Sequence, residues 1–337
     1  MSVSNPLTQL FARQRPFVPL LLAPMAGITD RPFRNLARRY GADLTLSEMV
    51  ASQAMVRHTA RSIKIAGSCS EKTDQPEEEL VAVQIAGADP EVMAEAARLN
   101  VQHGATLIDI NMGCPVKKIA KSHAGAALMR DERLAGQIMA AVVAAVAVPV
   151  TIKIRLGWDE QQRNALRIAR IAEDSGIAAV TVHGRTRAQM YHGSADWQAI
   201  AAIKAGVTIP VIGNGDITCP QVARQVWQSS AVDGLMIGRA AIGRPWIFRE
   251  IAHFLRNGTL LPAPAWPERK KLIEEHYAQI IAFHGPVVGN RLARKHLAWH
   301  TRGLVGGARF REQLNYSPDA ENTGRLLTDF LAGVEEP

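Results

Sequence analysis

The chain has 337 residues, of which 47% are hydrophobic and 21% are charged. This composition excludes a disordered chain and a fibrous repeat protein, and the length suffices for one large domain with an appendage. The formal net charge of +8 and the sequence pI near 9.7 favour an anionic partner without identifying one.

Three cysteines, Cys69, Cys114 and Cys219, lie far apart in the sequence. An odd number of widely spaced cysteines fits neither a disulfide framework nor a zinc site, so we expect no metal and a reducing, cytoplasmic location. The Ala- and Val-rich run 138–148 is shorter than the roughly 20 residues that a membrane span needs. We therefore expect no contact with a membrane.

From residue 20 to about residue 240, short apolar runs alternate with amphipathic segments. The runs read as eight strands: 20–25, 44–49, 81–87, 107–113, 150–157, 178–185, 209–216 and 234–240. Between them, segments such as 90–103 and 160–175 carry apolar residues at helical spacing. Four segments end at glycines that can adopt a left-handed cap conformation: Gly41, Gly104, Gly176 and Gly206.

This order predicts parallel βα units and, with eight of them, an α/β fold of the (β/α)8 TIM barrel type. An open doubly wound sheet is the alternative. After residue 248 the pattern changes: 262–270 reads as a linker, and 269–284, 289–304 and 323–334 read as helices. We expect an N-terminal extension (1–17), a barrel domain (18–250) and a small C-terminal helical domain (251–337).

Polar side chains and glycines stand where the predicted strands end, and in such barrels the chemistry lies on the loops after the strands. They are Pro24 to Gly27, Glu48, Gln84, Asn111 with Cys114, Lys153 with Arg155, His183 with Arg185, Asn214 to Asp216, and Gly238 with Arg239. The glycine turns after strands seven and eight predict a phosphate site, because glycine lets backbone N–H groups approach an anion. Two tight turns without a ligand are the alternative.

Several of these side chains allow more than one reading. Lys153 can form a Schiff base, stay charged beside a cofactor, or pair with a buried carboxylate. His183 can bind a ligand, transfer a proton, or lie satisfied in the core. The amides of Gln84 and Asn111 can recognise the edge of a ring or cap a loop. A Rossmann site is not supported, because Thr218 replaces the third glycine of that fingerprint.

The chain resembles the tRNA-dihydrouridine synthases, and most closely their bacterial B-type branch, in the motifs LLAPMAGITDRPFR, VAVQIAG, IDINMGCPVKK, VTIKIRLGW, VHGRTR, IGNGDI and MIGRAAIGRPWIF. The likeness runs from about residue 18 through the helical tail. It implies an FMN-dependent enzyme that reduces a uridine in the D-loop of tRNA to 5,6-dihydrouridine, with NADPH or NADH recharging the flavin. The B-type likeness suggests position 17.

The resemblance also implies roles for single residues. Those against the flavin would be Pro24, Met25, Ala26, Gln84, Lys153 and His183, and those around its ribityl phosphate Asn214, Gly215, Asp216, Gly238 and Arg239. Asn111 would contact the uracil, and Cys114 would protonate C5 after hydride transfer from flavin N5 to C6. An unperturbed thiol, with a pKa of about 8.5, is mostly protonated at neutral pH and can serve as an acid.

The tail carries a basic cluster. Residues 287–316 hold six basic residues and one acidic residue, Glu312. We expect Arg291, Arg294 and Lys295 to contact tRNA phosphates, and an ordinary solvated helix face is the alternative. The target base must turn out of its loop to reach the flavin.

Three rival functions remain open at this point. One is an FMN barrel that reduces a small molecule, although the basic tail favours a nucleic acid substrate. Another is a lyase or aldolase that uses Lys153 as a Schiff base. The last is an RNA-binding protein without catalytic activity.

Overall fold

The structure, a computed structural model, describes residues 17–57, 59, 81–116 and 123–334, together with Leu7, Leu10 and Phe11. Cys69 and most of the predicted N-terminal extension lie outside the described residues. The strands are β1 (Leu20–Leu22), β2 (Leu44–Thr45), β3 (Val50–Ala51), β4 (Ala82–Ala86), β5 (Leu107–Met112), β6 (Val150–Arg155), β7 (Ala179–His183), β8 (Val211–Asn214) and β9 (Gly234–Ile237). All their pairings are parallel.

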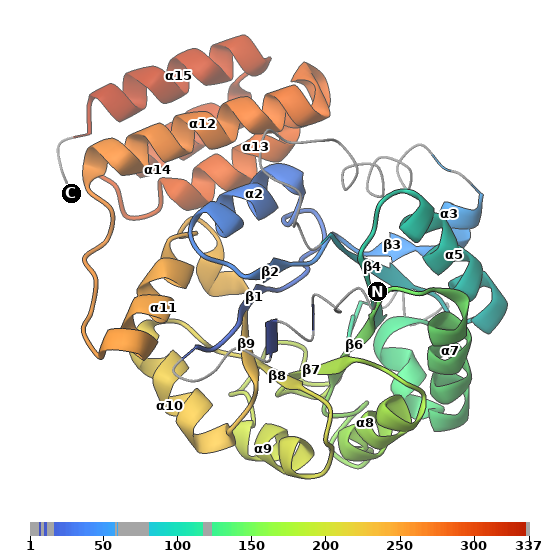
Figure 1. The fold of residues 1–337 in the computed structure, drawn as a ribbon. Helices are drawn as coiled ribbons and strands as arrows, with labels where there is room; N and C mark the ends of the chain where they lie inside the picture. Colours follow the sequence, from blue (N-terminus) through green and yellow to red (C-terminus); the bar gives the residue numbers. More distant parts are fainter. Residues whose placement is uncertain are drawn as a thin grey trace, which may run out of the picture.

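The sheet order β2-β1-β9-β8-β7-β6-β5-β4-β3 curls into the expected TIM barrel (Figure 1). The single strand predicted for 44–49 is wrong in one respect, because it divides into β2 and β3. Leu46 bridges Ala82 between them, and this bridge closes the barrel. At this division the Gln84 N–H donates to Ser47 Oγ at 3.1 Å, so a side chain from a distant part of the sequence takes the place of a ladder carbonyl.

Helices cover the outside of the barrel, as the periodicity predicts. They are α2 (Arg31–Arg39), α3 (Ser52–Val56), α5 (Pro90–Gln102), α7 (Glu132–Ala145), α8 (Ala165–Asp174), α9 (Trp197–Ala205), α10 (Pro220–Ser230) and α11 (Ile247–Asn257), with 3-10 turns η1 (Gly125–Arg130) and η2 (Arg239–Ala241). The predicted left-handed caps are confirmed at Gly41, Gly104 and Gly176 but wrong at Gly206, whose φ is −99°. A Cβ at Gly206 would lie 2.5 Å from Leu166 Cδ1, so close packing favours glycine there.

Strand alternation explains why the polar residues gather at one end of the barrel. On β5, Ile108, Ile110 and Met112 join the apolar layer against the helices, which leaves Leu107, Asp109 and Asn111 on the interior face. Leu107 belongs to an interior apolar cluster that includes Leu7 and Leu10. Other strands repeat the change from apolar to polar along the interior face, so the amino-terminal end is packed and the carboxyl-terminal end carries functional groups.

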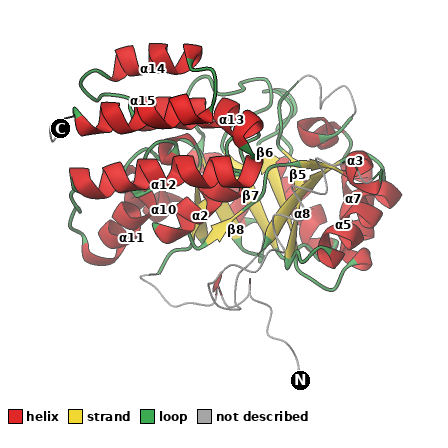
Figure 2. Ribbon diagram, turned by 90° about the horizontal axis from the view of Figure 1, so that it is seen from above, coloured by secondary structure: helices red, strands yellow, loops and turns green. Residues whose placement is uncertain are grey.

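Four more helices follow the barrel: α12 (Trp266–His284), α13 (Pro286–His300), α14 (Gly307–Tyr316) and α15 (Ala320–Ala332). Figure 2 shows them stacked beside the barrel. The linker predicted at 262–270 is wrong in its second half, because α12 begins at Trp266, whose ring is buried. The boundary predicted at residue 250 falls inside α11, so the division into domains stays a prediction. No helix of the described residues is long and apolar enough to cross a membrane.

Histidines of α12 and α13 and one phenylalanine lie where the C-terminal helices contact α2. The Phe33 ring centroid lies 5.8 Å from His276 and 5.7 Å from His296, and His276 Nδ1 lies 3.0 Å from His300 Nε2. All three imidazoles are buried. Burial lowers the pKa of His296 to about 4, that of His300 to about 3 and that of His276 well below its usual value. The cluster is therefore neutral at pH 7.

Candidate active site

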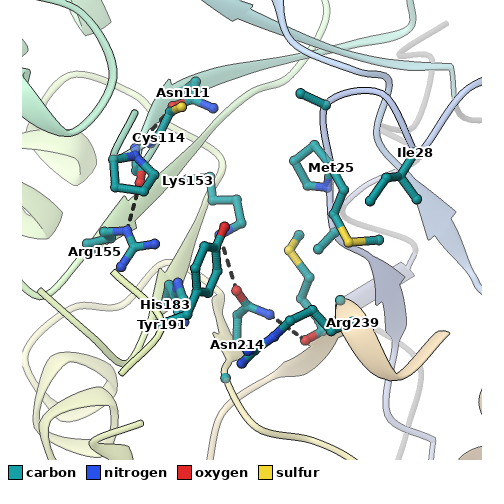
Figure 3. A pocket seen from close by; sticks show the side chains of 18 of the residues that line it. Met25, Ile28, Asn111, Cys114, Lys153, Arg155, His183, Tyr191, Asn214 and Arg239 are labelled. Carbon is teal, nitrogen blue, oxygen red and sulfur yellow. Dashed lines mark hydrogen bonds between the residues drawn. The ribbon is translucent and has the colours of Figure 1, made fainter. Parts of the chain in front are cut away.

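A cavity of about 770 Å³ opens among the loops that follow the strands. Thirteen of the predicted site residues line it: Pro24, Met25, Ala26, Gln84, Asn111, Cys114, Lys153, His183, Asn214, Gly215, Asp216, Gly238 and Arg239. Figure 3 shows Met25 and Arg239 facing Cys114 and Lys153 across it. Arg291, Arg294 and Lys295, predicted to contact tRNA, do not line this cavity.

A chain of hydrogen bonds runs across the interior from Asp109 to the backbone of Cys114. Asp109 Oδ1 accepts from Thr151 Oγ1 and Oδ2 accepts from Gln84 Nε2, each at 2.7 Å. Gln84 Oε1 in turn accepts from Asn111 Nδ2 at 2.7 Å. Asn111 Oδ1 accepts from the Cys114 N–H at 2.9 Å. Asn111 therefore caps the loop, the alternative reading of this amide, and still borders the cavity.

Three elements hold the loop that carries Cys114. Besides Asn111 of β5, Arg155 of β6 donates from Nε to the Gly113 carbonyl at 2.8 Å, and Ala126 of η1 donates to the Cys114 carbonyl at 3.1 Å. The thiol is partly exposed and borders the cavity. A fixed backbone and the buried Pro115 ring limit where the sulfur can point.

Lys153 extends from β6 toward β8 and donates to Asn214 Oδ1 at 3.2 Å. Asn214 is itself fixed, because its Nδ2 donates to the Met236 carbonyl at 2.8 Å. Burial and the neighbouring Arg155 lower the pKa of Lys153 to about 8, against the opposing charge of Asp109. No direct bond joins Lys153 to Asp109 among the hydrogen bonds and ion pairs of the described residues.

His183 lies in a cationic surrounding. Burial, followed by the charges of Lys153, Arg155, Arg185 and Arg239, lowers its pKa to about 2. The ring is therefore neutral at pH 7, which leaves hydrogen bonding and packing as its possible roles and removes that of a neutral-pH acid. Its centroid lies 6.2 Å from the ring of Tyr191.

The predicted phosphate turns carry unusual backbone conformations. Gly215 has φ of +140° and Asp216 has φ of +53°, and a Cβ at Gly215 would lie 2.5 Å from Ala195 Cβ, so only glycine fits there. Two consecutive residues with positive φ form a tight turn, the kind of local geometry in which backbone N–H groups can make an anion-binding concavity. The Asp216 carboxylate accepts from Arg185 Nη2 at 2.7 Å and from Arg239 Nη2 at 3.2 Å. It thereby holds the exposed Arg239 beside the turn.

The turn after β1 is bonded to helix α13. The Met25 N–H donates to Thr29 Oγ1 at 2.9 Å, which closes the turn that carries Pro24 and Ala26. At Gly27, the N–H donates to Glu48 Oε1 and the carbonyl accepts from Lys295 Nζ of α13. Lys295 is half-buried, and burial lowers its pKa. Lys295 therefore makes an internal hydrogen bond to the Gly27 turn, although it lies near the surface.

The other two predicted tRNA contacts differ from each other. Arg294 Nη2 donates to the Ser317 carbonyl at 2.6 Å and so holds the connection between α14 and α15. Arg291 is exposed on α13. A contact of all three residues with tRNA stays a prediction, and Arg291 is the one whose side chain makes no hydrogen bond or ion pair with another described residue.

Tyr191 is the main residue that sequence reasoning missed. It follows β7, is 52% exposed and lines the cavity, and the guanidinium carbons of Arg155 and Arg239 lie 5.6 and 5.1 Å from its ring centroid. The available signal was an aromatic residue in a glycine-containing loop after a strand, which predicts an exposed ring. Its spacing from His183 gave no indication that the two would meet.

The cavity suits a flat ring with an anionic tail. Ala23, Met25 and Met236 supply an apolar wall, Gln84 and Lys153 supply hydrogen-bond donors, and the turns at Gly215 and Gly238 with Arg239 form a cationic rim. Its volume lies within the range of about 300–1,000 Å³ that small-molecule and cofactor sites occupy. The described residues contain no group of three or more His, Cys, Asp and Glu side chains that could hold a metal ion.

Residues 21–334 match the family model described as "Dihydrouridine synthase (Dus)". The chain is 51% identical over 302 residues to tRNA-dihydrouridine synthase B of Pseudomonas putida, covering 90% of this chain and 88% of that protein. It is 50% identical over 314 residues to tRNA-dihydrouridine synthase B of Pseudomonas aeruginosa, covering 93% and 92%. It is 45% identical over 315 residues to the probable tRNA-dihydrouridine synthase of Rickettsia bellii, covering 94% and 95%.

Among solved structures, histamine dehydrogenase from Rhizobium sp. 4-9 superposes with a TM-score of 0.54 at 15% sequence identity. The match covers 81% of this chain and 51% of that longer chain. At this identity the likeness concerns the barrel fold alone.

Proposed function

Because the chain belongs to the dihydrouridine synthase family, we propose that it reduces a uridine of tRNA to 5,6-dihydrouridine. NADPH or NADH would serve as the reductant. The likeness to B-type relatives supports position 17 of the D-loop as the target. The helical domain and the cavity mouth would bind the tRNA.

The arrangement of Cys114 carries this proposal. Its thiol borders a cavity large enough for a ring cofactor and a flipped base, and Asn111, Arg155 and Ala126 fix its backbone from three elements. A reduction of uracil needs one proton donor at C5, and a partly exposed thiol on a fixed loop meets that need. A Schiff-base enzyme would not need this construction around a cysteine.

The residues present fit FMN. The apolar wall suits the flavin ring, and Lys153 can donate a hydrogen bond to the polar edge of that ring. The Gly215 turn with Arg239 suits the phosphate of FMN. When bound, FMN would supply the hydride that uracil C6 receives. Lys153 would hold a positive charge beside the ring, and the neutral His183 would pack against it without competing for a proton.

Asn111 and Cys114 would handle the base. Asn111 Nδ2 uses one hydrogen for Gln84, and its second hydrogen remains for a uracil carbonyl. Cys114 Sγ would deliver its proton to C5 and be reprotonated from solvent, because the thiol is partly exposed. Tyr191 at the mouth would pack against the turned-out nucleotide.

The test incubates the purified protein with FMN, NADPH and unmodified tRNA transcripts, and measures dihydrouridine by mass spectrometry. We expect yellow protein and one dihydrouridine per transcript, lost when position 17 is cytidine. Cys114→Ala should keep its flavin and its tRNA affinity but form product at least about 100-fold more slowly. Cys219→Ala is the matched control. A protein that binds no flavin, or a fully active Cys114→Ala variant, would contradict the proposal.

A further inference from the structure

Two arginines stack on one tryptophan at the rim of the barrel, outside the cavity lining. The guanidinium carbon of Arg130 lies 5.0 Å from the ring centroid of Trp158, and that of Arg187 lies 4.5 Å from it. Arg130 ends η1, Trp158 follows β6 and Arg187 follows β7, so all three stand on loops after strands. Bonds from the Arg187 and Ala188 N–H groups to Gly157 and Trp158 carbonyls, each 2.9 Å, hold the two loops together.

Arg130 and Arg187 form no ion pair with a carboxylate within the described part of the chain. The acids that flank Arg130 in the sequence are bound elsewhere, because Asp131 accepts from the Leu134 N–H at 2.9 Å and Glu132 pairs with Arg167 at 2.9 Å. Those that follow Trp158 are also bound elsewhere, because Asp159 accepts from the Gln161 and Gln162 N–H groups and Glu160 pairs with Arg163 at 3.2 Å. Cations that are stacked but unpaired are pre-arranged for an anion from outside the chain.

This pattern continues to the cavity mouth. Met190, three residues after Arg187, accepts from Arg155 Nη1 at 2.8 Å, and Tyr191 next to it carries Arg155 and Arg239 over its ring. Arginines and aromatic rings therefore alternate from Trp158 to Tyr191. Alternating cations and stacking platforms are typical of surfaces that follow a single-stranded nucleic acid.

The position of this surface complements the helical domain. It lies next to α7 and α8, which stand across the barrel from α12–α15 in Figure 1. Arg291 is exposed on α13 on the other side. Since Trp158 is not among the residues that line the cavity, a polynucleotide that reaches beyond the mouth fits this surface better than a compact molecule held in the cavity.

We propose that Arg130, Trp158 and Arg187 form a second tRNA-binding surface, the arginine–tryptophan surface, which contacts the backbone of the loop whose uridine enters the cavity. The inference rests on the proposed function, because it requires tRNA as the substrate. The arginines would bind phosphates, and Trp158 would keep their planes facing outward. The tRNA would thus be held on both sides of the mouth.

The test compares R130Q/R187Q with R98Q/R224Q. The control also removes two positive charges, but from exposed positions away from the proposed surface. Arg98 pairs with Glu95 on α5, and Arg224 stacks on Phe254. The affinity of each variant for tRNA is measured as a function of salt concentration, from low to moderate salt. Flavin content, dihydrouridine formation and the KM for NADPH in the absence of tRNA are measured as well. We expect R130Q/R187Q to bind about tenfold more weakly at low salt, with a salt slope smaller by about 1.4, and the control to resemble the parent.

The outcomes separate the two proposals. If the parent forms dihydrouridine and R130Q/R187Q binds tRNA like the control, the surface inference fails and the proposed function stands. If the parent neither binds tRNA nor forms dihydrouridine, the proposed function fails. If R130Q/R187Q raises the KM for NADPH and leaves tRNA affinity unchanged, the surface binds the dinucleotide, and the inference is overturned. R130K/R187K, which keeps the charges, should retain the parent's salt slope.

Discussion

The buried carboxylate of Asp109 determines which way two amides of the site face. An ionised carboxylate only accepts hydrogen bonds, so Gln84 must turn its Nε2 toward Asp109 and its Oε1 toward Asn111. Asn111 must then present Nδ2 to Gln84 and Oδ1 to the Cys114 N–H. Asp109, which would contact neither the flavin ring nor the uracil, thereby sets which atoms Gln84 and Asn111 present to them.

A pair of substitutions at Asp109 tests this orientation. Asp109→Asn keeps an oxygen for Gln84 and turns its amide to the Thr151 hydroxyl, so we expect most activity to remain. Asp109→Leu removes the acceptor, and we expect dihydrouridine formation to slow about 10- to 100-fold while flavin stays bound. Product formation and the flavin spectrum are the measurements. If both variants are equally impaired, charge rather than orientation matters.

The charge of Lys153 should appear in the pH profile. Because burial and Arg155 lower its pKa to about 8, the lysine loses its charge as the pH rises through about 8, while Asp109 opposes that loss. We expect dihydrouridine formation to decline above that pH. Lys153→Arg, which stays charged, should move the decline to higher pH. An unchanged midpoint in the arginine variant would assign the decline to another group.

At the scale of elements, α13 carries residues of two kinds, and substitutions should separate them. Lys295→Met removes the bond to the Gly27 carbonyl, so we expect unfolding free energy to fall by about 1 kcal/mol. Arg291→Gln should leave thermal unfolding unchanged and reduce the salt slope of tRNA binding by about 0.7 to 0.9. Thermal denaturation measures the stability of both variants, and the salt dependence of tRNA binding measures the contribution of each side chain to binding. Equal effects of both variants on both measurements would refute the distinction.

Sequence periodicity was sufficient for the elements that depend on local patterns. The barrel strands, the helices and the polar strand ends follow from alternation, spacing and glycine, and they place thirteen site residues in one cavity. The division of β2 from β3 was not predictable, since it depends on Ser47 meeting Gln84 across 37 residues. The internal bonds of Arg294 and Lys295 were equally hidden, because composition does not distinguish a solvated cation from one bound to a distant carbonyl.

For the whole molecule, the buried histidines make the contact between the C-terminal helices and α2 sensitive to acid. Their folded pKa values lie below the ordinary value of 6.5, so the unfolded chain binds more protons between about pH 4 and 6.5. Stability must fall as the pH drops through that window, by up to roughly 1 kcal/mol per pH unit for each histidine. We expect the thermal denaturation midpoint of the parent to be lower at pH 5 than at pH 7. The difference between the two pH values should be smaller in His296→Phe. A midpoint independent of pH would contradict this.

Gly27 joins the two parts of the molecule at one residue. Its N–H is held by a carboxylate of the barrel and its carbonyl by an ammonium group of α13, and the turn before it borders the cavity. A molecule seated against Pro24 to Ala26 would therefore restrict the same segment that α13 grips. The coupling free energy between the two contacts must be reciprocal. Flavin occupancy would then tighten tRNA binding, and tRNA would lower the dissociation constant of flavin by the same factor.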